Sequence, residues 1–340
     1  MNSKTIEVSI GQAVPNLTGT AATAAIAAWR EAQQLLQQCP FSVEDPFSEQ
    51  QDGYSLSMDV SSVIAVLDKA AKTDGGFPKF RQQLREKPQA DAVATIRITL
   101  AAKGTPHGEL AYYHASAVAL QQLYLCLNIA APGSCQFVDT RFPDVATASF
   151  DPLNLESAPF VDGYLNSVDA EWPVIKPLAV ATVWNWLDAM NTSETDTAIL
   201  STNKVLFGLL ELGYSQSGLK NKNIVLICHL LELLTETTLA DSLNQVRSRL
   251  KLMLGSRSQE GDSLHELYRL KQNYISGARP YRRQALKIHD TQEESIRQLA
   301  THNSPAEEGL AIIIAVLQKL VQANASGFKF EEQLTLATMG

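Results

Sequence analysis

One short segment of the chain, residues 267–287, concentrates the residue types that bind a polyanion. Its sequence, LYRLKQNYISGARPYRRQALK, contains no Asp or Glu. The whole chain has a formal net charge of −8, so a polyanion would need a local basic patch of this kind. The segment fits three interpretations: an RNA-cutting site, the remnant of one, or an ordinary solvated helix face. The basic residues of the segment are Arg269, Lys271, Arg279, Arg282, Arg283 and Lys287.

Other chemistry-bearing residues do not form recognisable sites. The stretch GGFPKF (75–80) lacks the Lys-Ser/Thr ending of a phosphate-binding loop, and we interpret it as a turn. His107 and His114 are seven positions apart, whereas two metal ligands on one helix prefer a separation of four. Cys228 and His229 are adjacent, so on a helix they cannot face each other as a nucleophile and its base. We therefore expect no metal site and no cofactor.

The four cysteines, no two of which form a CxxC pair, favour a reduced environment. They are Cys39, Cys126, Cys135 and Cys228, and we expect buried thiols rather than disulfides. The N-terminal residues lack the apolar region of a secretory signal, and no run of eighteen apolar residues occurs. These observations predict a cytoplasmic protein with no membrane span.

The elements that must position the basic segment belong to the second half of the chain. From about residue 171 the apolar residues recur with a period near 3.6, and short connections are marked by Gly213, Gly218, Gly255, Gly261 and Pro305. This pattern predicts an all-helical bundle over residues 171–340. The expected helices cover 176–190, 197–213, 221–236, 239–254, 262–276, 284–302 and 306–324.

The first half mixes both kinds of element. We expect strands at 4–10 and 90–102 and helices at 18–38, 61–72 and 108–130. Residues 131–170 are rich in loop residues, with short strands expected at 145–151 and 159–168. The sequence thus predicts an α+β domain over residues 1–170 followed by the all-α bundle, and a protein that is mainly helical overall.

Two runs, CHLLELL (228–234) and LYRLKQNYISG (267–277), and the order of the expected helices over residues 195–325 resemble the HEPN superfamily, in particular the Apea-like prokaryotic domains of RNase type. The run CHLLELL is similar to an apolar helix end of that family, with Glu232 where the family often has its Glu. The segment LYRLKQNYISG is similar to the closing pattern Leu-Tyr-x-x-Arg-Ser-x-x-x-His-Gly. The matching positions are Leu267, Tyr268 and Gly277. The departing positions are Lys271 for Arg, Gln272 for Ser and Ser276 for His.

The resemblance implies metal-independent RNA cleavage in a cleft between two copies of the bundle. In such a reaction the ribose 2′-hydroxyl attacks the neighbouring phosphorus, a His moves or positions the proton, and an Arg stabilises the charge on phosphate. Lys271 still offers a point charge, though without the bidentate fork of Arg. Ser276 does not titrate near neutral pH, so the acid–base partner is missing. We therefore expect binding rather than cutting.

The predicted function is that of a HEPN-like protein with a degenerate nuclease motif. It would act as an RNA-binding, dimerising or scaffolding component of a prokaryotic antiviral defence or toxin-type system. Its expected partners are RNA and a second copy of the chain. The residues expected to bind RNA are Arg269, Lys271, Asn273, Arg279, Arg282, Arg283 and Lys287.

Two alternatives remain. In the first, the protein is an active endoribonuclease in which Arg283 and His289 form a shifted motif, or in which Lys271 works with a His such as His265. Arg297 and His302 have a similar spacing. In the second, the protein is an interaction subunit of a larger assembly, with the first domain as its recognition surface. The aromatic stretch WPVIKPLAVATVWNW (172–186) would then pack between domains or against a partner.

Overall fold

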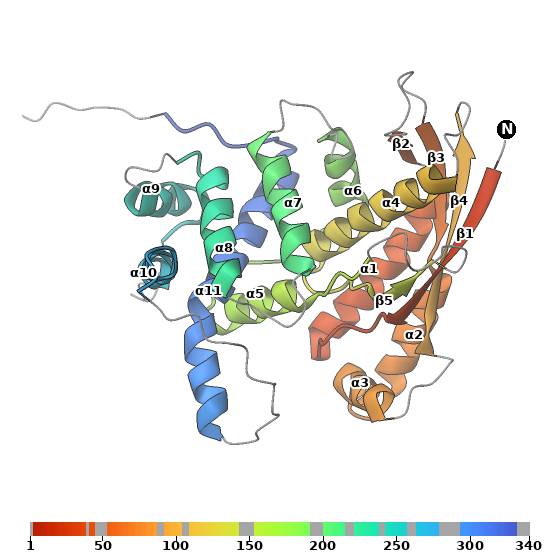
Figure 1. The fold of residues 1–340 in the computed structure, drawn as a ribbon, viewed down its shortest axis with the longest axis horizontal. Helices are drawn as coiled ribbons and strands as arrows, with labels where there is room; N and C mark the ends of the chain where they lie inside the picture. The colour runs from red at the N-terminus through yellow and green to blue at the C-terminus, as the bar shows by residue number, and fades with distance from the viewer. Residues whose placement is uncertain are drawn as a thin grey trace, which may run out of the picture.

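The computed structural model describes eleven stretches of the chain, and all structural statements below concern them. They are residues 3–38, 41–44, 53–86, 92–103, 109–142, 153–190, 200–214, 221–237, 242–256, 263–278 and 293–331. A five-stranded sheet and its covering helices occupy one end of the molecule, and helices alone form the other end (Figure 1).

The sheet is antiparallel and has the strand order β2-β3-β4-β1-β5. The alternating apolar pattern of the longer strands turns one face toward the core, where Ile6 and Ile98 face each other and are fully buried. The opposite face carries Glu7 and Arg97, which are also paired across the strands. The strands are β1 (Ser3–Gln12), β2 (Phe41–Glu44), β3 (Gly53–Asp59), β4 (Ala94–Ala102) and β5 (Val138–Arg141).

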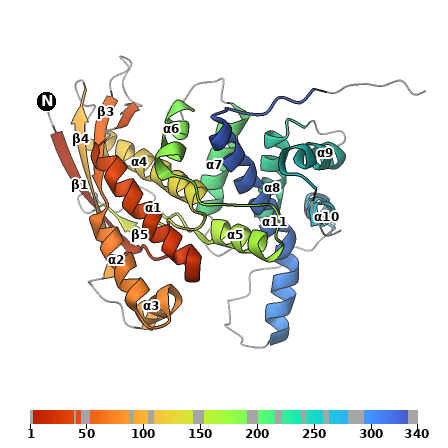
Figure 2. The same cartoon turned by 180° about the vertical axis from the view of Figure 1, so that it is seen from behind.

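Four helices accompany the sheet, and those that pack on it lie on its apolar face (Figures 1 and 2). They are α1 (Gly19–Gln38), α2 (Ser61–Lys72), α3 (Gly76–Glu86) and α4 (Glu109–Ala130). The helix α4 is apolar nearly all round because it contacts the sheet at β2 and also α6, α7 and α11 of the helical half. It therefore joins the two halves of the molecule.

The helical half is arranged around α11, which contacts α5, α8 and α10. Its segment Leu310–Val316 is buried throughout, as expected for a helix surrounded by others. The helices are α5 (Ala158–Asp169), α6 (Val180–Ala189), α7 (Ser201–Gly213), α8 (Asn221–Leu234), α9 (Ser242–Leu254), α10 (Ser263–Ile275) and α11 (Glu293–Ala323).

The predicted fold class is confirmed: a sheet with helices precedes a region of helices only, and the protein is mainly helical. Three local predictions are wrong. Residues 159–168 form most of α5 rather than a strand. The break predicted between the helices at 284–302 and 306–324 is absent: residues 293–323 form one helix, α11, which continues through Pro305, and residues 284–292 lie outside the described stretches. The predicted turn GGFPKF is a turn only at Gly75 and Gly76, where φ is +82° and +61°, and α3 begins directly there.

The predicted boundary near residue 170 falls within a continuous core. Buried apolar side chains form one cluster that includes the sheet and the helical half. The helix α5 precedes residue 170 yet packs closely against α11, where Gly163 lets the two backbones approach. Trp184 and Trp186 of the aromatic stretch are buried, and α6, which carries them, contacts α1, α4 and α11. The strand predicted at 145–151 lies outside the described residues.

Candidate functional site

The helix α10 carries the positions that resemble the nuclease motif. Leu267 and Leu270 are buried and anchor this helix in the bundle, where it contacts α8 and α11. The helix ends at Ile275, and Gly277 follows with φ of +71°. A residue in the left-handed region commonly ends a helix, which explains the glycine at this position.

Lys271 points into the bundle rather than toward solvent. Its Nζ lies 2.7 Å from Oε1 of Glu232 on α8, and the two side chains are only 17% and 9% exposed. The same Nζ lies 5.3 Å from the centre of the Tyr268 ring, within range of a cation–π contact. The ammonium is thus neutralised inside the protein. To bind phosphate, Lys271 would have to leave a nearly buried ion pair.

The residues around this ion pair cannot supply acid–base chemistry at neutral pH. Cys228 of α8 and Tyr268 of α10 are the titratable side chains that feel the charges of this pair. Burial raises the pKa of the Cys228 thiol to about 12, an effect that the Lys271 charge partly offsets. Burial and the neighbouring Glu232 also raise the pKa of Tyr268. Both groups therefore stay protonated, and neither is a nucleophile or a general base.

Ser276 lies just beyond the end of α10 and is exposed. Its hydroxyl donates to the carbonyl of Asn273 at 3.5 Å and accepts from the backbone N–H of Ala278 at 3.4 Å. These bonds belong to the helix end and involve no titrating group. His265 is exposed on α10, but six positions before Lys271 it lies about 120° away around the helix axis. The proposed pairing of Lys271 with His265 therefore has no shared helix face.

The exposed basic side chain of α10 is also paired with an acid. Arg269 forms two bonds with Glu266, from Nε to Oε2 at 2.6 Å and from Nη2 to Oε1 at 2.5 Å. Glu266 and Glu232 both lie outside the segment 267–287, so the absence of acids within the segment overstates its local positive charge. Asn273 is partly buried on the same helix.

The remaining predicted site residues lie outside the described stretches. They are Arg279, Arg282, Arg283, Lys287 and His289. The shifted Arg283–His289 motif and most of the predicted RNA-binding residues therefore stay predictions. Arg297 and His302 belong to α11.

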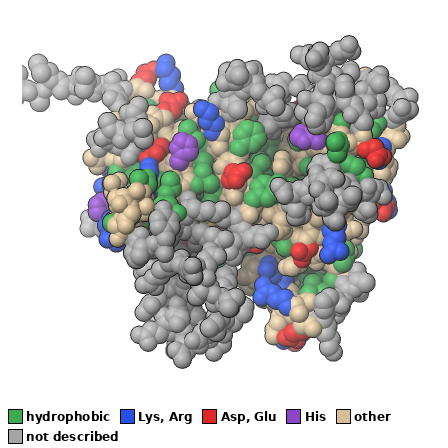
Figure 3. All heavy atoms as spheres, in the orientation of Figure 1, with side chains coloured by type: hydrophobic (Ala, Val, Ile, Leu, Met, Phe, Trp, Pro, Cys, Tyr) green, Lys and Arg blue, Asp and Glu red, His purple; other side chains and the backbone are tan. Residues whose placement is uncertain are grey.

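A second site, which the sequence analysis missed, lies where α3 meets the β1–β5 edge of the sheet. A cavity of about 480 Å³ opens there, and its lining includes the side chains of Arg81, Arg85 and Arg141. On the face of the molecule in Figure 3, basic and acidic side chains are mostly scattered, and basic ones gather at the lower right close to α3. Arg81 and Arg85 are four positions apart, the spacing of neighbours on one helix face. The two glycines at the start of α3 favour a turn, so the sequence pattern does not predict the helix on which this spacing has meaning.

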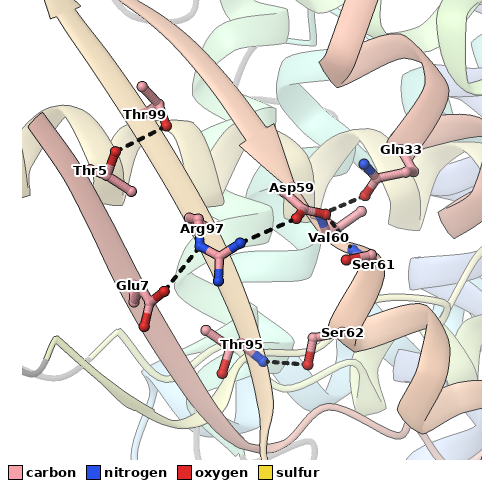
Figure 4. Close-up of polar contacts among 10 residues, drawn as sticks. All are labelled: Thr5, Glu7, Gln33, Asp59, Val60, Ser61, Ser62, Thr95, Arg97 and Thr99. Atoms are coloured by element: carbon pink, nitrogen blue, oxygen red, sulfur yellow. Dashed lines mark hydrogen bonds and ion pairs between the residues drawn. The ribbon is translucent and has the colours of Figure 1, made fainter. Parts of the chain in front are cut away.

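We call the face of the sheet that no described helix covers the uncovered face; on it, Arg97 lies between the carboxylates of Glu7 and Asp59 (Figure 4). Nε of Arg97 lies 3.0 Å from Oε1 of Glu7, and its Nη1 lies 3.7 Å from Oδ2 of Asp59. Hydrogen bonds from Ser61 are the main reason why the pKa of Asp59 is lowered. The neighbouring positions are small hydroxyl side chains such as Thr5 and Thr99, whose Oγ1 atoms are 3.2 Å apart. The described strands present no aromatic ring here, so this face does not offer a base-stacking platform.

No family model, curated protein or solved structure matches this chain. Among the described residues, no group of three or more His, Cys, Asp or Glu side chains could hold a metal ion. In the same stretches, no helix is both long enough and apolar enough to cross a membrane.

Proposed function

We propose that this protein binds RNA without cutting it and acts as a dimerising or scaffolding component in the cytoplasm. The resemblance of residues 195–325 to the HEPN superfamily supports a role in a prokaryotic antiviral defence or toxin-type system. The main observation in favour of binding without cleavage is the ion pair between Lys271 and Glu232, whose Nζ and Oε1 atoms are 2.7 Å apart. The residue in the motif's Arg position is a nearly buried cation that is already paired with a carboxylate.

The state of the other motif groups agrees with this proposal. RNA cleavage without a metal needs a group that moves a proton near neutral pH and a cation that meets the phosphate. Ser276 supplies no such group, and Cys228 and Tyr268 stay protonated because burial raises the pKa of each. In this arrangement α10 keeps its structural role in the bundle and has no catalytic one.

The binding part rests on the basic residues that follow α10. Arg279, Arg282, Arg283 and Lys287 occur within nine positions, without an acid between them. Each cation that contacts a phosphate of single-stranded RNA contributes about 0.7 to the slope of log affinity against log salt concentration. We therefore expect RNA binding to weaken steeply with salt.

The test is fluorescence anisotropy with a labelled single-stranded RNA, and gel analysis of the same RNA after incubation. We expect saturable binding of intact RNA. The Arg282→Glu/Arg283→Glu variant should bind at least tenfold more weakly, with a salt slope smaller by about 1.4. Lys319→Glu, a charge reversal at an exposed position of α11, is the control and should bind within twofold of the wild type. Absence of RNA binding at low salt would refute the proposal.

The gel also decides the alternative of an active enzyme. If the purified protein cuts RNA and His289→Ala abolishes the cutting while binding persists, the shifted Arg283–His289 motif is the working site. Cleavage that requires Lys271 would refute the structural role assigned to its ion pair.

A further inference from the structure

The cavity beside α3 brings three arginine side chains together from two separate elements. Arg81 and Arg85 lie one turn apart on α3, so both point to the same side of this helix. Arg141 is the last residue of β5 and is paired with Ser9 of β1, which also lines the cavity. Residues that face each other in antiparallel strands point to the same side of the sheet, so Arg141 and Ser9 share the uncovered face.

The three arginines line one cavity, and at least two of them, Arg81 and Arg85, repel each other. Burial lowers the pKa of Arg81, the positive charge of Arg85 lowers it further, and the negative charge of Glu156 offsets only part of this, since the pKa stays lowered. Arg81 donates a hydrogen bond to the backbone carbonyl of Val14 at 3.3 Å. This acceptor is neutral, so it does not neutralise the guanidinium charge. In the described part of the chain, none of the three arginines forms an ion pair with a carboxylate. Because arginine stays protonated, an anion is the species that would relieve this repulsion.

One carboxylate also lines the cavity. Asp139 adopts a left-handed backbone with φ of +57°, and its Oδ2 accepts a hydrogen bond from Nε2 of Gln12 at 3.0 Å. Three arginines and one aspartate leave a formal charge of +2 among the lining residues. A phosphate monoester carries close to −2 at neutral pH, whereas a phosphodiester within an RNA strand carries −1.

The volume agrees with a ligand larger than a single ion. About 480 Å³ falls within the range of small-molecule sites and exceeds the roughly 30 Å³ share of one water many times over. Val93, which is 42% exposed, and Leu84 give the cavity an apolar wall beside its charged groups. A cavity with a few convergent charged groups and an apolar wall suits a phosphate attached to an organic group.

We propose that this arginine pocket binds a phosphate monoester, such as the phosphate of a mononucleotide or the 5′-terminal phosphate of an RNA strand. Arg81, Arg85 and Arg141 hold the phosphate oxygens, and planar guanidinium groups suit bidentate contacts with them. The RNA part of this assignment rests on the proposed function, whereas binding of a mononucleotide does not depend on it.

Isothermal titration of the full chain with 5′-AMP, inorganic phosphate and adenosine tests the pocket directly. We expect 5′-AMP to bind, adenosine not to bind, and binding to strengthen from pH 5 to pH 7.5 as the monoester loses its second proton. Inorganic phosphate that binds as tightly as 5′-AMP supports the pocket as a site for the phosphate group alone. Failure of both phosphates to bind overturns the proposal.

Variants locate the site. Arg85→Gln and Arg141→Gln replace exposed residues and should each weaken 5′-AMP binding at least tenfold. Lys79→Gln removes an equal charge from the same helix outside the cavity lining and should bind within twofold of the wild type. Arg81 is half-buried, so Arg81→Gln is interpreted only with an unchanged circular dichroism melt. Equal binding by the wild type, Arg85→Gln and Arg141→Gln overturns the proposal.

A pair of RNA oligonucleotides that differ only in a 5′-phosphate separates this inference from the proposed function. Tighter binding of the phosphorylated strand, lost in Arg85→Gln, supports both. Equal binding of the two strands, with no binding of 5′-AMP, refutes the pocket but leaves RNA binding intact. Binding of 5′-AMP without any RNA binding supports the pocket and refutes the proposed function.

Discussion

At the scale of single residues, the Lys271–Glu232 ion pair is the feature whose structural role is least visible in the sequence. A carboxylate that is only 9% exposed depends on its partner, since removing that partner leaves a nearly buried charge. We expect Lys271→Ala to lower the free energy of unfolding by about 2–4 kcal/mol in urea denaturation. The control, Arg269→Ala, breaks an exposed pair with Glu266 and should leave the free energy of unfolding close to that of the wild type.

Two further measurements distinguish a structural Lys271 from an RNA-binding one. The double variant Glu232→Leu/Lys271→Met removes both charges and should recover most of the lost stability. RNA affinity at a temperature where Lys271→Ala is folded should stay within twofold of the wild type. A large loss of RNA affinity with unchanged stability would contradict the structural role.

Glu307 and Asp162 give the molecule a predictable response to pH. They lie on α11 and α5, and burial raises the pKa of Glu307 to about 7 and that of Asp162 to about 6. The Asp162 charge adds to the shift at Glu307. A carboxyl group whose folded pKa exceeds its unfolded value binds more protons in the folded state. Its ionisation as pH rises from about 4.5 to 7 therefore lowers stability.

We expect the wild type to lose stability between pH 5 and pH 8 and Glu307→Gln to lose less of it. The difference should be on the order of 1–2 kcal/mol, since partial exposure screens part of the effect. Urea denaturation at pH 5, 6.5 and 8 measures it. Glu211→Gln, at an exposed position of α7, is the control and should follow the wild type. Parallel curves for wild type and Glu307→Gln would contradict the assignment.

At the scale of elements, sequence periodicity located the helices well where one face is buried, and it failed where tertiary packing decides. The α5 segment contains Phe160, Val161, Gly163 and Ser167 as buried positions, a helical spacing that a high content of β-forming residues masked. Pro305 was expected to end a helix, because proline removes a backbone donor and clashes with the preceding turn. The helix α11 continues through it, and the buried residues that follow Pro305 pack against α5, α8 and α10.

The arginine pocket shows the corresponding limit for sites. Arg81 and Arg85 are visible in the sequence as neighbours on one helix face, but Arg141 lies more than fifty positions away. The strand β5 that carries it has only four residues, too few for an alternation pattern. Long-range strand pairing with β1 brings it to the pocket, and a local pattern contains no information on such pairing.

The crossing of α11 with α8 and α10 depends on a small residue. A Cβ added at Gly309 would lie 2.6 Å from Cγ2 of Ile227 on α8 and 3.1 Å from Cδ2 of Leu267 on α10. We expect Gly309→Ala to destabilise the protein by about 1–2 kcal/mol, because overpacking exceeds the roughly 1 kcal/mol gain in helix propensity. Gly327→Ala, whose added Cβ would meet only Thr202 at 3.9 Å, should be near neutral in the same urea denaturation. A stabilised Gly309→Ala variant would show that the helices can separate at this crossing without cost.

At the scale of the whole molecule, an acidic chain can bind RNA only if its cations act locally. The formal charge of −8 repels a polyanion at long range, and in the proposed function the arginine pocket and the basic residues that follow α10 in the sequence would attract it at short range. Two copies meeting near α10 would double the local positive charge without changing the charge of the remaining surface. Dimerisation and RNA binding are therefore expected to depend on each other.

Ile275 offers a way to test this dependence. It ends α10, beside the motif positions, and is 60% exposed although it is a large apolar residue. An exposed apolar residue at this position suits a contact between two copies, and an aspartate there would place two like charges against each other across a two-fold axis.

We expect light scattering after size exclusion to give about 74 kDa for the wild type, twice the 37.2 kDa of one chain. Ile275→Asp should shift this mass to that of one chain and weaken RNA binding at least tenfold. Val174→Asp, at a 68% exposed apolar position before α6, should change neither quantity. A wild type that stays at 37.2 kDa with and without RNA would rule out the dimer and leave a single chain as the RNA-binding unit.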